Sequence, residues 1–356
     1  MILTIAVPLY NMEELIKRCL DSVLVPEYQG VYEVLVINDG SKDRSLTIAK
    51  DFEIKYPEVF RVIDKNNGNW GSCINLAISE ARGKYLRVLD ADDYFGVEET
   101  SAFIEQLLAL KDDVDLVQTR CQLCYSDGSL GESFQYKIEY GKIYSADKIV
   151  FSWPFMHYAI HTATFNVELL RKNGIKLQEG MSYCDVELCT YSYAFVNKVV
   201  FFDIILYKYY IGRPGQSVSH ESYLKAVDKL ERIFSRMIDE RQHFFAAEGT
   251  NKLKSQSYYV SALFGQYTYI MLLENKKMAD SEVHKKKFAE IWKDMLNYFP
   301  DIYENIKNNK IYGLNYVKIW NDKGLFISDI YNGLYLEFYK YLHGLYMFLK
   351  KRILVK

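Results

Sequence analysis

The alternation of apolar runs with amphipathic segments in the first hundred residues constrains the fold more than any other feature of this sequence. Four short apolar runs are predicted to form strands, at residues 2–7, 31–37, 60–63 and 85–89. Three segments between them have helical periodicity, at residues 15–24, 45–55 and 72–81. Continuous apolar runs are typical of strands covered on both faces. Repeated βα units of this kind predict an α/β fold with a doubly wound, mostly parallel sheet.

Three of these predicted strands end in polar, loop-forming segments. The segments are residues 8–11, 38–41 and 90–93. Ligands of doubly wound sheets bind beyond the carboxyl ends of the strands, so the three segments should converge on one cleft. This convergence predicts a functional site.

The third segment holds three aspartates in four positions, Asp90, Asp92 and Asp93. Their mutual repulsion is costly unless something compensates it, and a bound Mg²⁺ or Mn²⁺ would do so. These ions use one or two protein carboxylates together with substrate phosphates, so a diphosphate ligand is expected beside them. The structural alternative is a solvated acidic turn.

Beyond about residue 114 the pattern becomes mixed, and from about residue 222 it is mostly helical. Strands are expected at 114–124, 159–165 and 199–211, and helices at 167–173 and 184–196. The change of pattern near residues 212–215 predicts two domains. The first covers 1–218, with a nucleotide half (1–110) and an acceptor half (111–218), and a helical domain covers 219–356.

Composition narrows the classes of protein that this chain can belong to. The net charge of -2 gives no global attraction to nucleic acid. The first residues lack the basic region and cleavage site of a signal peptide, and no apolar run reaches the roughly 18 residues of a membrane span. Six cysteines without an export signal are expected to be reduced thiols, so a cytoplasmic location is expected.

Five segments of the chain together resemble inverting family 2 glycosyltransferases, which have the GT-A (nucleotide-diphospho-sugar transferase) fold. Three of them match in order and spacing over residues 1–110: VPLYN, VINDGSKDRS and NGNWGSCINLAISEARGKYLRVLDADD. The similarity continues more weakly to about residue 219, through SYCDVE and YKYYIGRPGQSVS. The resemblance implies an enzyme that uses a nucleotide sugar such as a UDP-sugar, together with Mn²⁺ or Mg²⁺.

The resemblance also implies roles on the donor side of the site. Asp92 would be the direct metal ligand, with Asp90 directed toward ribose and metal and Asp93 toward the sugar. Asp39 would bind the uracil edge, and Arg213, in a segment that resembles the family's closing loop, would contact the diphosphate. The remaining positions would border the base and ribose or close over them: Pro8, Tyr10, Asn11, Glu13, Asn69, Gly71, Ser72 and Asn75.

These donor-side positions also have structural alternatives. Asn11 stands where a helix N-cap belongs, and residues 39–41 form a turn sequence. Tyr10 could equally be a packing residue.

An inverting transfer needs a base for the proton of the acceptor hydroxyl. The resemblance implies that this base is Asp185, which stands where the family carries an acidic residue that opens a helix. The family usually has an acidic pair there, whereas Cys184 precedes the aspartate in this chain. Glu187 is the fallback, and the alternative for Asp185 is an acid that interacts with a helix dipole. His161 is expected to border the acceptor or else to be a packed histidine.

The last stretch, residues 331–356, is aromatic and ends in a basic cluster. Such a helix could lie on an anionic membrane surface, pack on its own domain, or form a homodimer interface.

The sequence therefore predicts an inverting transfer of a hexose or N-acetylhexosamine from a UDP-sugar to a hydroxyl of a growing surface glycan or lipid-linked oligosaccharide. A nucleotidyltransferase of related fold and a catalytically inactive glycan-binding protein are the alternatives. The donor sugar, the acceptor and the linkage stay open.

Overall fold

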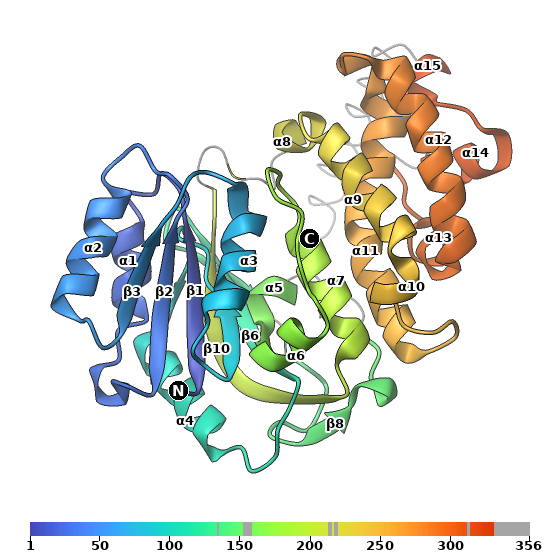
Figure 1. The fold of residues 1–356 in the computed structure, drawn as a ribbon. Coiled ribbons are helices and arrows are strands. Elements are labelled where there is room, and N and C mark those ends of the chain that lie inside the picture. The colour runs from blue at the N-terminus through green and yellow to red at the C-terminus, as the bar shows by residue number, and fades with distance from the viewer. Residues whose placement is uncertain (134, 152–158, 213–215, 217–219, 312–313, 331–356) are drawn as a thin grey trace, which may run out of the picture. The chain divides into compact units, whose positions relative to one another are not determined.

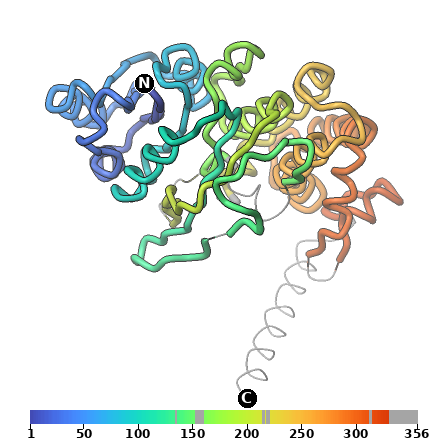
Figure 2. Tube along the Cα trace, turned by 90° about the horizontal axis from the view of Figure 1, so that it is seen from below, coloured from blue at the N-terminus to red at the C-terminus, as the bar shows by residue number. Residues whose placement is uncertain are grey.

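The computed structural model describes residues 1–133, 135–151, 159–212, 216, 220–311 and 314–330 (Figure 1). The chain divides into two compact units, whose path is traced in Figure 2. The first comprises Met1–Ser217 and Glu240–Tyr259, and the second comprises Val218–Asp239 and Val260–Lys356. The predicted boundary near residue 218 stays a prediction.

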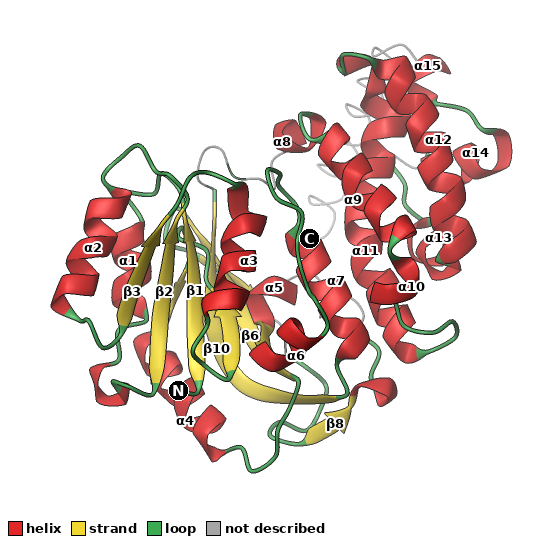
Figure 3. Cartoon of the chain, in the orientation of Figure 1, coloured by secondary structure: helices red, strands yellow, loops and turns green. Residues whose placement is uncertain are grey.

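The first unit is built on a ten-stranded mixed sheet (Figure 3). Its strand order is β3-β2-β1-β4-β9-β6-β10-β5, with β7 paired to β6 and β8 to β10. The strands are β1 (Leu3–Leu9), β2 (Tyr32–Asn38), β3 (Phe60–Asp64), β4 (Tyr85–Val88), β5 (Tyr94–Phe95), β6 (Leu116–Tyr125), β7 (Leu130–Ser133), β8 (Ile143–Ser145), β9 (Ala163–Asn166) and β10 (Lys198–Ile211).

The half of the sheet formed by β3, β2, β1 and β4 is parallel, as the βα pattern predicts. Strand β9 then pairs antiparallel to both β4 and β6, and β5 pairs antiparallel to β10. The sheet is therefore more mixed than predicted beyond β4. The segment 159–165, expected to be one strand, begins as the short helix α5 (Ala159–Thr162) and continues as β9.

Helices cover both faces of the parallel half. The alternate residues Leu3, Ile5, Val7 and Leu9 of β1 are buried in a core with residues of α1, α2 and α4. Helix α3 packs on β1 and β2 and also contacts α6; it lies in front of the strands in Figure 1. The helices of this unit are α1 (Ile16–Ser22), α2 (Ser45–Lys55), α3 (Asn69–Glu80), α4 (Val97–Ala109), α5, α6 (Val167–Lys172), α7 (Asp185–Phe195) and α10 (Arg241–Phe244).

The second unit is helical, as the pattern beyond residue 222 predicts. Its core is aromatic, with Phe264 packed edge-on to Phe234 and stacked on Trp292. Its elements are α8 (His220–Leu224), α9 (Val227–Asp239), α11 (Asn251–Tyr269, from Val260 on), a π-turn (Ile270–Glu274), a 3₁₀ turn (Asn275–Lys277), α12 (Ser281–Tyr298), α13 (Pro300–Ile306), α14 (Tyr316–Lys323) and α15 (Ile327–Ile330). Within the described part of the chain, every helix is too short or too polar to cross a membrane.

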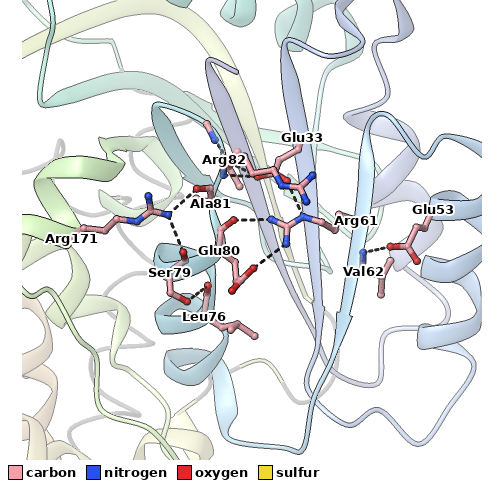
Figure 4. Close-up of polar contacts among 12 residues, drawn as sticks. Glu33, Glu53, Arg61, Val62, Leu76, Ser79, Glu80, Ala81, Arg82 and Arg171 are labelled. Carbon is pink, nitrogen blue, oxygen red and sulfur yellow. Dashed lines mark hydrogen bonds and ion pairs between the residues drawn. The ribbon is translucent and has the colours of Figure 1, made fainter.

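A buried polar network at the amino ends of the strands holds the first unit together (Figure 4). Glu33 of β2 accepts hydrogen bonds from the hydroxyl of Thr4 at 2.8 Å and the backbone N–H of Arg82 at 2.8 Å. Its second oxygen accepts from Nε of Arg61 at 3.1 Å. Arg171 donates to three backbone carbonyls at the end of α3, where a helix lacks internal donors. This network lies at the end of the sheet away from the three polar segments, so its role is structural.

We expect Glu33→Ala to lower the free energy of unfolding by about 3 kcal/mol, measured by urea denaturation. The change removes the acceptor of the Thr4 hydroxyl, of the Arg82 N–H and of Nε of Arg61, although Arg61 still bonds Glu80. The matched control is Asp21→Ala, which removes an exposed pair with Lys17 and should cost less than about 1 kcal/mol. Equal losses in both variants would show that the network does not stabilise the fold.

Candidate functional site

The three polar segments meet at the carboxyl edge of the parallel half, at the top of the sheet in Figure 1. The ends of β1 and β2 are in register, since Leu9 pairs with Asn38. The N–H of Asp39 continues this ladder to the carbonyl of Leu9 at 2.8 Å, and the N–H of Leu89 donates to Ala6 at 2.9 Å. The parallel register therefore places residues 8–11, 38–41 and 90–93 side by side.

Asp39 is held by a network of hydrogen bonds. Its side chain is almost fully buried, and Oδ1 accepts from the Lys65 ammonium at 2.5 Å and the Gly68 N–H at 2.9 Å. Lys65 also donates to the Ser72 hydroxyl at 2.8 Å. Two residues predicted for the nucleotide, Asp39 and Ser72, are thus joined through one lysine that we did not predict. Lys65 follows β3 directly, so the rule that picked out the other strand ends could have found it.

The loop after β1 is tied to the loop after β2. The backbone N–H of Asn11 donates to the Ser41 hydroxyl at 3.0 Å, and the Asn11 amide oxygen accepts from the N–H of Lys42 at 2.7 Å. Glu13 accepts from the backbone and side chain of Arg44 at 3.0 and 3.2 Å. Tyr10 is 46% exposed beside them.

Asn11 does not cap α1, contrary to the capping alternative, because that helix begins at Ile16 and its N-cap residue is Leu15. Asn11 instead has a left-handed backbone, with φ of 51°. Asparagine tolerates this conformation better than most residues. Pro8 lies within β1 opposite Ile37.

Residues at the start of α3 contact both one another and the segment before α7. Asn69 has φ of 64°, and its carbonyl accepts from the Ser72 hydroxyl at 2.7 Å. A Cβ on Gly71 would lie 2.2 Å from the carbonyl oxygen of Gln178, so only glycine fits there. The side-chain amide of Asn75 bonds both backbone groups of Leu177, at 2.8 and 3.0 Å. Asn75 therefore holds the segment before α7, and its predicted part in binding base or ribose stays a prediction.

The acidic segment 90–93 is fixed residue by residue. Asp93 is 1% exposed and accepts from the Tyr207 hydroxyl at 2.6 Å and the N–H of Tyr210 at 2.7 Å. Oδ1 of Asp90 accepts from the indole N–H of Trp70 at 2.8 Å. The carbonyl of Asp92 accepts from the Arg18 guanidinium at 2.7 Å.

Arg18 supplies positive charge next to this segment. Its guanidinium lies between the rings of Tyr94 and Tyr210, 4.6 and 4.5 Å from their centres. Burial, followed by the charges of Asp92 and Asp90, raises the pKa of the Asp93 carboxyl well above its ordinary value. The three neighbouring carboxyl groups therefore disfavour one another's ionisation, and a cation bound beside them would relieve that repulsion.

Among the described residues, Asp90, Asp93 and His161 form a group that could hold a metal ion, with ligand atoms within 4.8 Å of one another. Two carboxylates and an imidazole are a donor set that Mn²⁺ accepts. His161 lies against Tyr209, with ring centres 4.4 Å apart. Its carbonyl accepts from the buried Arg87. These residues therefore fit a divalent cation. The group includes His161 and not Asp92, so the role of Asp92 as direct ligand stays a prediction.

Asp185 and Glu187 lie in the first turn of α7 in different environments. Asp185 is half-buried. Burial raises the pKa of its carboxyl, and the nearby charge of Glu187 raises it further. Burial, followed by the charges of Asp93, Asp90, Asp92 and Asp185, raises the pKa of the Tyr209 hydroxyl, so Asp185 lies near the acidic segment. Glu187 is fully buried and accepts from the backbone and side chain of Gln178 at 2.8 and 2.7 Å.

Two predictions fall outside the described residues. These are Arg213, expected at the diphosphate, and the tail 331–356, expected at a membrane surface or in a dimer. Besides Lys65, three residues that shape the site were not predicted: Arg18, Trp70 and Tyr207. Each acts through side-chain contacts with other elements, and no periodicity or strand-end rule signals such contacts.

Comparisons with known proteins agree with this architecture. The family model "Glycosyl transferase family 2" matches residues 4–174. The chain is 26% identical over 249 residues to the uncharacterized glycosyltransferase YibD of Escherichia coli (strain K12), covering 66% of this chain and 70% of YibD. It is 44% identical over 95 residues to the uncharacterized glycosyltransferase MG025 of Mycoplasma genitalium, covering 26% of this chain and 32% of MG025.

The fold is shared with S. aureus TarS. The crystal structure of TarS 1–349 in complex with UDP-GlcNAc superposes with a TM-score of 0.60 over 91% of this chain and 93% of the TarS chain, at 16% identity. A likeness at this identity concerns the fold, and that fold is of the GT-A type. From the matched family model and this fold together, residues 4–174 form a family 2 glycosyltransferase domain.

Proposed function

We propose that this glycosyltransferase moves a hexose or N-acetylhexosamine from a UDP-sugar to a hydroxyl of a growing surface glycan or lipid-linked oligosaccharide, with inversion at the anomeric carbon. The observation that carries the proposal is the convergence of Asp39, the acidic segment 90–93 and Asp185 on one edge of the sheet. The UDP-GlcNAc complex of TarS, a protein of the same fold, supports the choice of nucleotide.

In this proposal the nucleotide binds along the ends of β1, β2 and β3. Asp39 accepts a hydrogen bond from the uracil edge, and Lys65 fixes the Asp39 carboxylate for it. Tyr10, which is exposed in the loop after β1, borders the base together with Pro8, Asn11 and Glu13. The start of α3, with Asn69, Gly71, Ser72 and Asn75, closes over base and ribose.

The diphosphate lies at the carboxyl end of β4. Asp90 and Asp92 would hold a divalent cation there, Mn²⁺ or Mg²⁺, which would neutralise charge on the leaving diphosphate. Asp93 is too deeply buried to move freely, since Tyr207 and Tyr210 hold both of its oxygens. It therefore fixes the acidic segment against β10 on the sugar side, and Arg213 contacts the phosphates.

Asp185 takes the proton of the acceptor hydroxyl as that oxygen attacks the anomeric carbon. The raised pKa of its carboxyl makes it a better proton acceptor than an ordinary aspartate. Its place in the first turn of α7 keeps the acid at a helix amino end. His161, whose ring lies close to Asp90 and Asp93, borders the acceptor.

The test is donor turnover by the full chain with a panel of nucleotide sugars and Mn²⁺. We expect release of UDP from one UDP-sugar well above the rates with GDP- and CMP-sugars, because Asp39 recognises the uracil edge. With an accepted hydroxyl compound, nuclear magnetic resonance should show a product of anomeric configuration opposite to the donor. A retained configuration would contradict single displacement, and turnover of a GDP-sugar alone would contradict the uridine site.

A further inference from the structure

One carboxylate of the acidic segment is held by a side chain from another element. The indole N–H of Trp70, in the first turn of α3, donates to Oδ1 of Asp90 at the end of β4 at 2.8 Å. Trp70 is half-buried, so its ring lies at the margin of the site. An N–H donor stabilises the anionic form of a carboxylate, because hydrogen bonds to an ionised acceptor are stronger than neutral ones.

The backbone on either side fixes the position of this tryptophan. Asn69 is held in a left-handed conformation, with φ of 64°. Gly71 lies so close to the segment before α7 that an added Cβ would be 2.2 Å from the Gln178 carbonyl oxygen and 2.9 Å from Cys184 Sγ. The turn therefore cannot shift without disturbing its neighbours, and the indole is presented to Asp90 from a rigid support.

We propose that Trp70 is a positioning residue for the metal, because its N–H fixes the plane of the Asp90 carboxylate and thereby the direction of the remaining oxygen lone pairs. The inference rests on the proposed function, which places a divalent cation at Asp90. Ligating carboxylates in metal sites are themselves hydrogen-bonded, and loss of such a partner typically costs 10–100-fold in metal affinity. The Asp90–Asp93–His161 group and the predicted Asp90–Asp92 pair share Asp90, so the role of Trp70 holds for either ligand set.

The test compares Trp70→Phe with the wild-type chain by electron paramagnetic resonance of free Mn²⁺ in the presence of saturating UDP. Phenylalanine keeps an aromatic ring and removes only the N–H donor and the second ring. We expect Mn²⁺ affinity to fall about 10–100-fold, while the affinity for UDP in EDTA and the melting temperature stay near the wild-type values. The control is Trp292→Phe, which lies in the helical unit and should bind Mn²⁺ as the wild type does.

A spectroscopic signature separates positioning from packing. Paramagnetic Mn²⁺ should quench tryptophan emission of the wild-type chain, and Trp70→Phe should lose most of that quenching, whereas Trp292→Phe should keep it. Unchanged Mn²⁺ affinity in Trp70→Phe would overturn this inference and leave the proposed function standing. Loss of UDP binding in EDTA, or a melting temperature several degrees lower, would also overturn it, since Trp70 would then be structural. A wild-type chain that binds neither Mn²⁺ nor UDP would overturn both proposals.

Discussion

Asp185→Asn should lower the rate of glycosyl transfer by about 10²–10⁴-fold while leaving donor binding and thermal stability close to wild type. The acceptor hydroxyl is a weak nucleophile until its proton is leaving, and the amide cannot take that proton. The amide keeps the size of the carboxylate and can still accept hydrogen bonds from the backbone at the start of α7. The measurement is transfer at saturating UDP-sugar, beside calorimetric affinity for UDP.

The pH dependence gives a second readout of the same residue. Burial raises the pKa of the Asp185 carboxyl above its ordinary value of 3.8. A base works only when deprotonated, so transfer should rise with pH through this raised pKa and fall below it. In the wild-type chain, the fall in transfer rate toward acid pH should therefore have its midpoint above pH 3.8. The low residual rate of Asp185→Asn should not show this fall.

Glu187→Gln is the matched control, two residues along the same helix. Glu187 is fully buried, and its two oxygens accept from the N–H and the side-chain amide of Gln178. An amide there can satisfy only one of these donors, so this variant should lose stability, by about 1–3 kcal/mol, and keep its turnover when folded. Near-normal turnover in Asp185→Asn together with lost turnover in folded Glu187→Gln would move the base to Glu187.

The parallel half of the fold could be predicted because its signals are local. Residues 45–55 were predicted as a helix and form α2, and the four apolar runs became β1 to β4 within one or two residues. Parallel register then brings their carboxyl ends together, which is why three polar segments could be assigned to one edge before any coordinates were known.

The remaining features depend on contacts between distant residues. The antiparallel position of β9 follows from its pairing with both β4 and β6, which no local pattern encodes. Asn11 fits an N-cap in sequence, but the structure uses its amide to bind the loop after β2. Glu187 resembles a second catalytic acid, and only its burial against Gln178 shows that it holds the turn before α7. The buried Asp93 likewise owes its environment to Tyr207, which is 114 residues away.

Removal of the metal should have the second large effect, on nucleotide affinity. A diphosphate placed beside three aspartates is repelled unless a cation lies between them, and little water screens the repulsion there. EDTA should therefore weaken UDP binding to the wild-type chain by at least about 100-fold. That factor is the upper end of the loss in metal affinity when a hydrogen-bond partner of a metal ligand is removed. Isothermal titration calorimetry with Mn²⁺ and with EDTA measures this directly.

Asp92→Ala should bind UDP in Mn²⁺ about as weakly as the wild type does in EDTA, and EDTA should then weaken this variant little further. Two changes that remove the same interaction are not additive, so this pattern identifies Asp92 as a ligand. Asp39→Ala is the control, because it acts on the uracil edge and should weaken UDP binding with and without metal by the same factor. If His161→Ala reproduces the EDTA effect and Asp92→Ala does not, the ion is held by Asp90, Asp93 and His161, whose ligand atoms lie within 4.8 Å of one another. If EDTA changes nothing in the wild type, the acidic segment acts without a cation, and protein groups such as Arg18 must balance its charge.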